Sequence, residues 1–355
     1  MEVLYVVSTE SFSGKSAIIL CLALSLQKKG FEVGFMKPLS TFPAEFEGAL
    51  VDEDAYCIWN YLQLEYPPEL ISPLALSSQA MREHMLGKVK AKPAQIARSF
   101  KKIAKDKDIV ILEGAEDLWK GRCLEFSAHQ VAEMLDARVL LIGKAQADSV
   151  TDEILVAHDI LQQRLIGVIL NSAPHSYIEA LKDFIVPTLK GKGIEVFGII
   201  PEDKILQAVK VEEIAKHLGG EILCALEKSE ELVEEFMVGA MSQENAFRYF
   251  RRKPNKAVIT GGDRADVQLA ALETSTKCLI LTGGFRPSPI VLARAQDLGI
   301  PMILVDVDTF TAVDKMEALI GHVSIREERK IKQMGMLLDR HVRLEDLFQS
   351  MGLKC

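Results

Sequence analysis

Short apolar runs alternate with longer amphipathic stretches along the first two hundred residues. The runs read VLYVVS, EVGFMKPLS, DIVILEG, RVLLIGKA, LIGVILNS and EVFGIIP, and β-branched residues are frequent in them. Runs that are apolar at nearly every position are typical of strands buried on both faces of a parallel sheet. The pattern therefore predicts a doubly wound α/β domain over residues 1–205.

A second series of alternating segments follows after residue 203. AVKVEEIAKHLGGEI predicts a helix that ends at a glycine, and KAVITGG, KCLILTGG and PMILVDVD predict strands. We interpret the acidic stretch EKSEELVEE, residues 227–235, as the solvated face of a helix. These segments predict a second, smaller α/β domain over residues 206–325.

The last segment, residues 326–355, has five apolar residues and one histidine close to helical spacing. They are Met334, Leu337, Leu338, His341, Leu344 and Phe348. We expect a helical tail that docks on the body of the protein or on a second subunit.

Composition narrows the classes of function. The 355 residues include 50 acidic and 42 basic side chains, so no basic surface for nucleic acid or an anionic membrane is expected. The N-terminal MEVLYVVSTE has no basic region before its apolar run, which predicts a cytoplasmic protein without a signal peptide. None of the six cysteines forms a C-x-x-C pair, which argues against a zinc site.

The stretch TESFSGKSA follows the first predicted strand and opens the first predicted helix. Gly14, Lys15 and Ser16 match the end of the pattern G-x-x-x-x-G-K-[ST], while Thr9 stands where that pattern has its first glycine. Backbone N–H groups of such a loop can wrap phosphates, the lysine neutralises them and the hydroxyl binds Mg²⁺. The alternative is a chance turn between strand and helix.

Further polar residues stand at the ends of other predicted strands. Lys37 ends the second predicted strand, Asp54 lies at the start of a predicted helix, and Glu113 follows the apolar run IVIL. A parallel sheet gathers such residues at its carboxyl edge. Ser16, Asp54 and Glu113 form a suitable Mg²⁺ ligand set, and Lys37 adds positive charge for phosphoryl transfer.

Six segments follow one another along the first domain: STESFSGKS, FMKPLS, DEDA, ILEGA, VILNS and GIIPED. In this order they resemble dethiobiotin synthetase over essentially the whole domain. The resemblance implies ATP and Mg²⁺ as cofactors and Lys15 and Lys37 as candidate catalytic residues. It implies Ser16, Asp54 and Glu113 as metal ligands. The nucleotide-binding residues that it implies are Thr9, Glu10, Ser13, Gly14, Lys15, Ser16, Asn171 and Pro201.

The sequence departs from that family after Glu113. Glu116 and Asp117 stand where the family has glycines, and two carboxylates there would repel an anionic acceptor. This difference argues against dethiobiotin synthesis as the activity of this protein.

The second domain contains the pattern T-G-G-x-R twice, each time between a predicted strand and a predicted helix. The two copies span residues 260–264 and 282–286. Arg264 and Arg286 could bind a carboxylate or phosphate, making a small anionic ligand the candidate partner. The alternative is that the glycines only form turns, while Asp263 pairs with Arg264 or Arg286.

These residues resemble the DRTGG domain, whose name matches Asp263-Arg264 and Thr282-Gly283-Gly284 here. A dethiobiotin-synthetase-like domain followed by a DRTGG domain resembles the N-terminal part of long phosphate acetyltransferases. We expect the acetyltransferase domain to be absent from this chain. The resemblance implies an ATP-binding regulatory or sensory module, with a homodimer expected. Two alternatives remain: an ATP-dependent ligase that activates a carboxylate or carbamate, and a scaffold that binds no nucleotide.

Overall fold

The chain forms two compact units. In the computed structural model, residues 1–40, 43–46, 48–75, 78–87, 93–321 and 327–353 are described. One unit comprises Met1–Glu202 together with Ser324–Cys355, and the other comprises Asp203–Val323. The C-terminal segment thus belongs to the first unit, although it follows the second along the chain.

A six-stranded parallel sheet forms the centre of the first unit, in the order β10-β9-β8-β1-β7-β2. Every strand predicted from the apolar runs is present, which confirms the predicted parallel α/β class. The strands are β1 (Glu2–Ser8), β2 (Val33–Met36), β7 (Ile109–Glu113), β8 (Arg138–Lys144), β9 (Leu165–Ala173) and β10 (Val196–Pro201).

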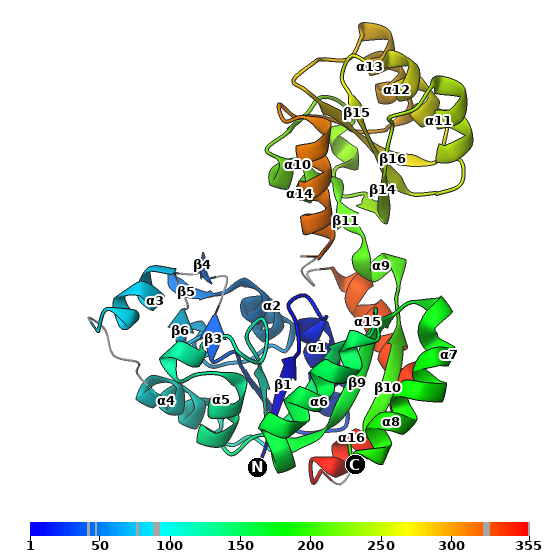
Figure 1. The fold of residues 1–355 in the computed structure, drawn as a ribbon. Coiled ribbons are helices and arrows are strands. Elements are labelled where there is room, and N and C mark those ends of the chain that lie inside the picture. Colours follow the sequence, from blue (N-terminus) through cyan, green and yellow to red (C-terminus); the bar gives the residue numbers. More distant parts are fainter. Residues whose placement is uncertain (41–42, 47, 76–77, 88–92, 322–326, 354–355) are drawn as a thin grey trace. The chain divides into compact units, whose positions relative to one another are not determined.

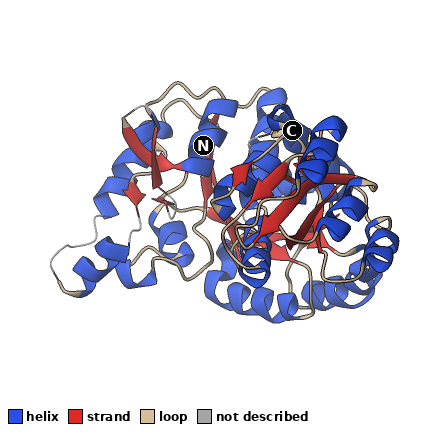
Figure 2. Ribbon diagram, turned by 90° about the horizontal axis from the view of Figure 1, so that it is seen from above, coloured by secondary structure: helices blue, strands red, loops and turns tan. Residues whose placement is uncertain are grey.

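Helices lie on both faces of this sheet (Figures 1 and 2). In β1, Tyr5 packs in one core cluster while its neighbours Leu4 and Val6, which point to the other face, are buried as well. Burial on both sides explains why the strands carry almost no polar residues. The helices of this unit are α1 (Lys15–Lys28), α2 (Glu53–Tyr61), α3 (Ser78–Met85), α4 (Pro93–Ile103), α5 (Ala128–Met134), α6 (Ser149–Leu161), α7 (Ile178–Ala180), α8 (Val186–Gly191), α15 (Glu328–His341) and α16 (Leu344–Ser350).

Two small sheets are inserted between β2 and β7. A parallel pair joins β3 (Leu39–Ser40) to β6 (Leu74–Ala75), and an antiparallel pair joins β4 (Pro43–Phe46) to β5 (Ala49–Asp52). The backbone N–H of Lys37 donates to the carbonyl of Ile71 at 2.7 Å, which ties the insertion to the end of β2. The insertion thereby brings the end of β5 close to the carboxyl edge of the main sheet.

The C-terminal helices pack on the first unit. The buried residues of α15 include Ile331, Met334 and Leu338, and the thiol of Cys21 in α1 donates to the carbonyl of Ile331 at 3.5 Å. Between α15 and α16, the N–H of Arg343 donates to the carbonyl of Phe197 in β10 at 2.9 Å. These contacts join the tail to both a helix and an edge strand of the first unit.

A five-stranded sheet in the order β12-β17-β16-β15-β14 forms the second unit, and only β12 runs antiparallel to its neighbour. The three predicted strands are present, whereas β12 and β14 were not predicted. The strands of this unit are β11 (Val209–Lys210), β12 (Glu221–Ile222), β13 (Leu232–Val233), β14 (Glu235–Val238), β15 (Lys256–Gly261), β16 (Thr276–Thr282) and β17 (Met302–Leu304), of which β11 and β13 form a separate pair. Its helices are α9 (Lys204–Gln207), α10 (Val211–Leu218), α11 (Gln243–Phe250), α12 (Ala265–Leu272), α13 (Pro289–Leu298) and α14 (Thr309–Gly321).

The prediction of a helix face at residues 227–235 is wrong. Only a short 3₁₀ turn occurs there, and Leu232–Val233 forms strand β13, which pairs antiparallel with β11. Val233 is buried, and Glu231 forms an ion pair with Lys277 at 2.7 Å. The acidic side chains therefore serve local ion pairs around a short strand, which a count of charges does not distinguish from a solvated helix.

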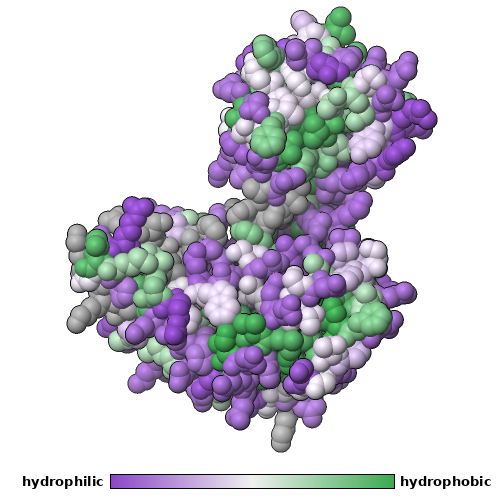
Figure 3. All heavy atoms as spheres, in the orientation of Figure 1, coloured by the Kyte–Doolittle hydropathy of each residue, from purple (hydrophilic) through white to green (hydrophobic). Residues whose placement is uncertain are grey.

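The visible surface of each unit is mostly hydrophilic, with smaller hydrophobic areas (Figure 3). Among the described residues, the helices are all too short or too polar to span a bilayer.

Leu338 tests the docking of the tail, because its side chain is 2% exposed on α15. We expect Leu338→Ala to lower the free energy of unfolding of the first unit by about 2–5 kcal/mol, through lost burial and the cavity left behind. Met336→Ala on the same helix is the control, because Met336 is 60% exposed. Urea denaturation measures both variants, and equal effects would contradict the packing described.

Lys256 provides a test of the second unit by pH. Its side chain is fully buried, and its ammonium donates to Thr274 Oγ1 and to the carbonyl of Ser275, both at 3.0 Å. Burial lowers the pKa of Lys256 to about 8, below that of the unfolded chain.

Between pH 8 and the unfolded pKa of about 10.4, the unfolded state therefore binds more protons, and the unit should gain stability as pH rises. Lys256→Met should lack this gain. Denaturant unfolding at several pH values measures the difference, and a parallel pH dependence of variant and wild type would show that Lys256 does not titrate as described.

Candidate phosphate-binding site

The predicted phosphate loop connects the end of β1 to the start of α1. Gly14 caps the helix with φ +82°, a conformation that favours glycine. A Cβ atom on Gly14 would lie 2.5 Å from Nδ2 of Asn171, so the close packing also requires glycine. The first turn of α1 carries no acidic residue, and the positive end of the helix dipole therefore faces the loop without a counter-charge of its own.

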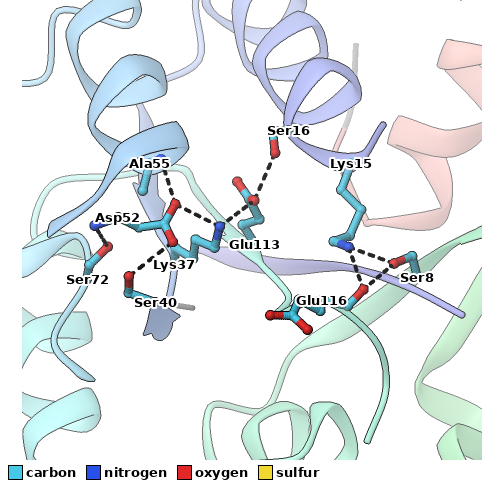
Figure 4. A network of polar contacts seen from close by, with 10 residues as sticks. All are labelled: Ser8, Lys15, Ser16, Lys37, Ser40, Asp52, Ala55, Ser72, Glu113 and Glu116. Carbon is cyan, nitrogen blue, oxygen red and sulfur yellow. Dashed lines mark hydrogen bonds and ion pairs between the residues drawn. The ribbon is translucent and has the colours of Figure 1, made fainter. Parts of the chain in front are cut away.

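Lys15 turns its ammonium group back toward the loop. Its Nζ atom donates to Ser8 Oγ at 2.7 Å and to the carbonyl of Glu116 at 3.1 Å (Figure 4). Burial lowers the pKa of Lys15 to about 8, although the charge of Glu113 acts in the opposite direction. The group is a buried cation held by two neutral oxygens, an arrangement that an anionic ligand would stabilise.

A continuous series of polar contacts links Ser16, Glu113, Lys37 and Asp52 (Figure 4). Ser16 Oγ donates to Glu113 Oε1 at 2.9 Å, and Lys37 Nζ lies 3.2 Å from the same oxygen. Lys37 also donates to Asp52 Oδ1 at 2.8 Å. Burial opposes the charge of Lys37, but the carboxylates of Glu113 and Asp52 hold its pKa above the usual value.

Three buried side-chain oxygens, two in the phosphate loop and one on Glu113, have no hydrogen-bond partner among the described residues. They are Thr9 Oγ1, Ser13 Oγ and Glu113 Oε2. A buried polar atom without a partner costs free energy, and a phosphate or a hydrated cation would supply the missing contacts. The donor set of Ser16, Asp54 and Glu113 fits Mg²⁺ in chemical type, because hydroxyl and carboxylate oxygens are its usual ligands.

The structure brings most of the sequence-predicted residues to this edge of the sheet. Asp54 lies in the first turn of α2, and its charge contributes to the raised pKa of Lys37. Glu10 lies in the loop, with its carboxylate 3.8 Å from the ammonium of Lys144 at the end of β8. Among the described residues, no three His, Cys, Asp or Glu side chains form a metal-binding cluster by themselves, and the set of Ser16, Asp54 and Glu113 contains only two such side chains.

Asn171 contacts the phosphate loop, whereas Pro201 lies at the end of the edge strand β10. Asn171 is buried in β9, and its Nδ2 donates to the carbonyl of Ser13 at 2.8 Å, so it supports the phosphate loop. Pro201 ends β10 opposite Ala173 of β9. The predicted contacts of both residues with a nucleotide base stay predictions.

Sequence reasoning assigned no site contact to Ser8, to Asp52 or to the backbone carbonyl of Glu116. Asp52 caps helix α2 by accepting from the N–H of Ala55 at 3.3 Å, a role that its place before the helix could have indicated. Glu116 contributes its backbone carbonyl, for which the sequence carries no signal. The side chain of Glu116 pairs with Lys120 at 2.9 Å, and Asp117 accepts from the N–H groups of Trp119 and Lys120. Both carboxylates thus have partners within their own loop.

The glycines of the two T-G-G-x-R segments lie where a strand turns toward the following helix. Gly283 and Gly284 have φ values of +82° and +70°, and their N–H groups donate to the carbonyls of Val307 and Val305. The N–H of Gly262 donates to the carbonyl of Thr282. These donors are therefore already used within the fold.

The ion pairs of Arg264 and Arg286 differ from the predicted pairing with Asp263, although the charge of Asp263 still acts on Arg264. Arg264 pairs with the neighbouring Asp266 at 3.1 Å, and Arg286 pairs with Glu221 at 2.9 Å. Because Asp266 opens helix α12 two residues beyond Arg264, it presents its carboxylate directly to the guanidinium. An anionic ligand at these arginines stays a prediction.

Two domain families match the chain. The family described as an AAA domain matches residues 2–235, and the DRTGG domain matches residues 213–319. The chain therefore belongs to this AAA domain family, with a P-loop domain like that of dethiobiotin synthetase, and carries a DRTGG domain after it. The predicted resemblance to both families is confirmed.

The relatives include proteins named phosphate acetyltransferase. Those of Synechocystis sp. and Nitratidesulfovibrio vulgaris are 24% and 26% identical, and the matches cover 97% of this chain and 51% of each relative. The chain thus spans about half the length of these curated relatives. An ATP-dependent dethiobiotin synthetase of Nitrosopumilus maritimus is 23% identical, over 61% of this chain and 96% of that protein.

Gly14→Ala tests the geometry of the loop. The substitution places a Cβ against Asn171 and strains a left-handed backbone, so the free energy of unfolding of the first unit should fall by roughly 1–3 kcal/mol. Gly191→Ala in α8 is the matched control, because a Cβ there meets nothing within 4 Å. Denaturant unfolding compares the two, and a Gly14→Ala protein as stable as the control would refute the loop conformation.

Proposed function

We propose that this protein binds Mg-ATP through the loop between β1 and α1 and that it has a regulatory or sensory role. The observation that carries the proposal is the buried ammonium of Lys15, which stands at the start of α1 beside the Ser16–Glu113 pair. A helix N-terminus with a lysine attracts phosphate, and a hydroxyl next to a carboxylate suits the accompanying cation.

In this proposal the chain's own residues divide the work. The backbone around Gly14 and the ammonium of Lys15 bind the β- and γ-phosphates. Ser16, Asp54 and Glu113 hold Mg²⁺, which lends positive charge to the phosphate oxygens. Lys37 reaches the terminal phosphate from the end of β2.

The regulatory role is supported by the DRTGG match and by relatives named phosphate acetyltransferase that contain the whole arrangement. Nucleotide bound at the first unit would alter the activity of a partner or the assembly of the chain. The proposal includes a cytoplasmic homodimer, and analytical ultracentrifugation with and without nucleotide measures that assembly.

One alternative activity has support of its own. The match to a dethiobiotin synthetase covers nearly the full length of that relative. An ATP-dependent ligase would transfer the γ-phosphoryl group to a carboxylate or carbamate and release one ADP for each acceptor consumed. ADP release that depends on one acceptor would favour the ligase. Slow hydrolysis that is indifferent to carboxylates and amines would favour regulation.

Isothermal titration of ATP with Mg²⁺ tests the proposed binding, using the wild type and Lys15→Ala. We expect wild type to bind, and the variant to lose at least about tenfold in affinity, because charge-assisted contacts with the phosphates disappear. Lys107→Ala is the control, because Lys107 pairs with Glu32 near the opposite edge of the same sheet.

Thermal or chemical unfolding gives an independent readout of the same binding. At about twenty times its dissociation constant, ATP should stabilise the wild type by about 1.8 kcal/mol. Absence of both heat and stabilisation would contradict the proposal and favour a scaffold that binds no nucleotide.

A further inference from the structure

Four charged side chains are buried together at the candidate site. Lys15, Lys37, Asp52 and Glu113 are 8%, 5%, 1% and 2% exposed. The group thus contains two ammonium groups and two carboxylates, so their formal charges cancel, and it is Lys37 that contacts both carboxylates directly (Figure 4). A triphosphate that enters such a site meets no net positive charge from these four groups.

The two carboxylates differ in whether an oxygen is left without a hydrogen-bond partner. Glu113 keeps one buried oxygen, Oε2, without a hydrogen-bond partner among the described residues. Both oxygens of Asp52 are used: Oδ1 accepts from Lys37 Nζ and from the N–H of Ala55, and Oδ2 accepts from Ser40 Oγ at 3.1 Å. Glu113 is thus available to a cation, whereas Asp52 contributes its negative charge and a fixed position for Lys37.

We propose that Asp52 makes nucleotide binding at this site strongly dependent on a divalent cation. Asp52 cancels the charge of Lys37. The positive charge that a triphosphate requires is therefore supplied by the divalent cation. This inference rests on the proposed function, and it names Asp52 as a positioning residue that acts through Lys37.

The geometry also shows how the charge can be removed with little change of shape. Asn is the same size as Asp and is an equally good helix cap, so Asp52→Asn keeps an oxygen for Lys37 and for the N–H of Ala55. The substitution leaves Lys37 with only Glu113 as a charged partner in direct contact. The four positions then carry a net charge of plus one.

The experiment is isothermal titration of ATP into wild type and Asp52→Asn at constant ionic strength, once with excess Mg²⁺ and once with EDTA. The quantity compared is the ratio of the two dissociation constants, metal-free over metal-bound. We expect Asp52→Asn to lower this ratio at least about tenfold, chiefly through tighter metal-free binding, because a buried negative charge near the phosphates is gone.

Two further variants separate charge from structure. Ser40→Ala removes the contact to Asp52 Oδ2 without changing charge, and its ratio should equal that of wild type. Lys37→Met changes the charge in the opposite direction, and its ratio should rise. Damage to the fold would weaken both affinities together and leave the ratio unchanged.

A ratio in Asp52→Asn equal to that of wild type, with both affinities retained, would overturn the inference while leaving nucleotide binding intact. A ratio lowered to the same degree in Ser40→Ala would also overturn it, because charge would not be the cause. Wild type that binds no ATP even with Mg²⁺ would overturn both this inference and the proposed function.

Discussion

The burial of opposite charges at the carboxyl edge of one parallel sheet is the constraint on which the candidate site depends. Taking Lys37 out of water is costly, and the cost is offset only because Asp52 and Glu113 lie 2.8 and 3.2 Å from its ammonium. The sheet provides this geometry, since β2 and β7 are hydrogen-bonded neighbours and end at the same edge. The inserted strand β5 brings Asp52 to them from outside the sheet. Removing any one of the three groups would leave a buried charge with fewer partners.

Much of the first unit could be predicted from sequence because its strands are buried on both faces. Such strands carry continuous apolar runs, and the polar residues that follow them then mark the site, as Lys15 and Glu113 did. Asp52 was missed because it ends a strand of an insertion whose two small sheets leave no periodic signal. The role of Glu116 rests on a backbone carbonyl, which any residue type would provide, so no pattern of side chains could have revealed it.

The second unit was less predictable for a related physical reason. Strands β12 and β13 have two residues each, too few for alternation to show, and the acidic residues around Val233 resemble a solvated helix. The glycines at 283 and 284 were correctly considered as turn residues, and their N–H groups donate to backbone carbonyls. Arg264 pairs with Asp266, two residues along the chain, whereas the ion pair of Arg286 with Glu221 depends on which loops meet in three dimensions, and sequence spacing does not contain that information.

A crystal structure with Mg²⁺ and a non-hydrolysable ATP analogue tests the central claim most directly. The account predicts a triphosphate at the N-terminus of α1, with the ammonium of Lys15 turned from Ser8 and the Glu116 carbonyl toward the phosphate oxygens. A saturated complex in which Lys15 still donates to Ser8 and Glu116, with the nucleotide bound elsewhere, would contradict it.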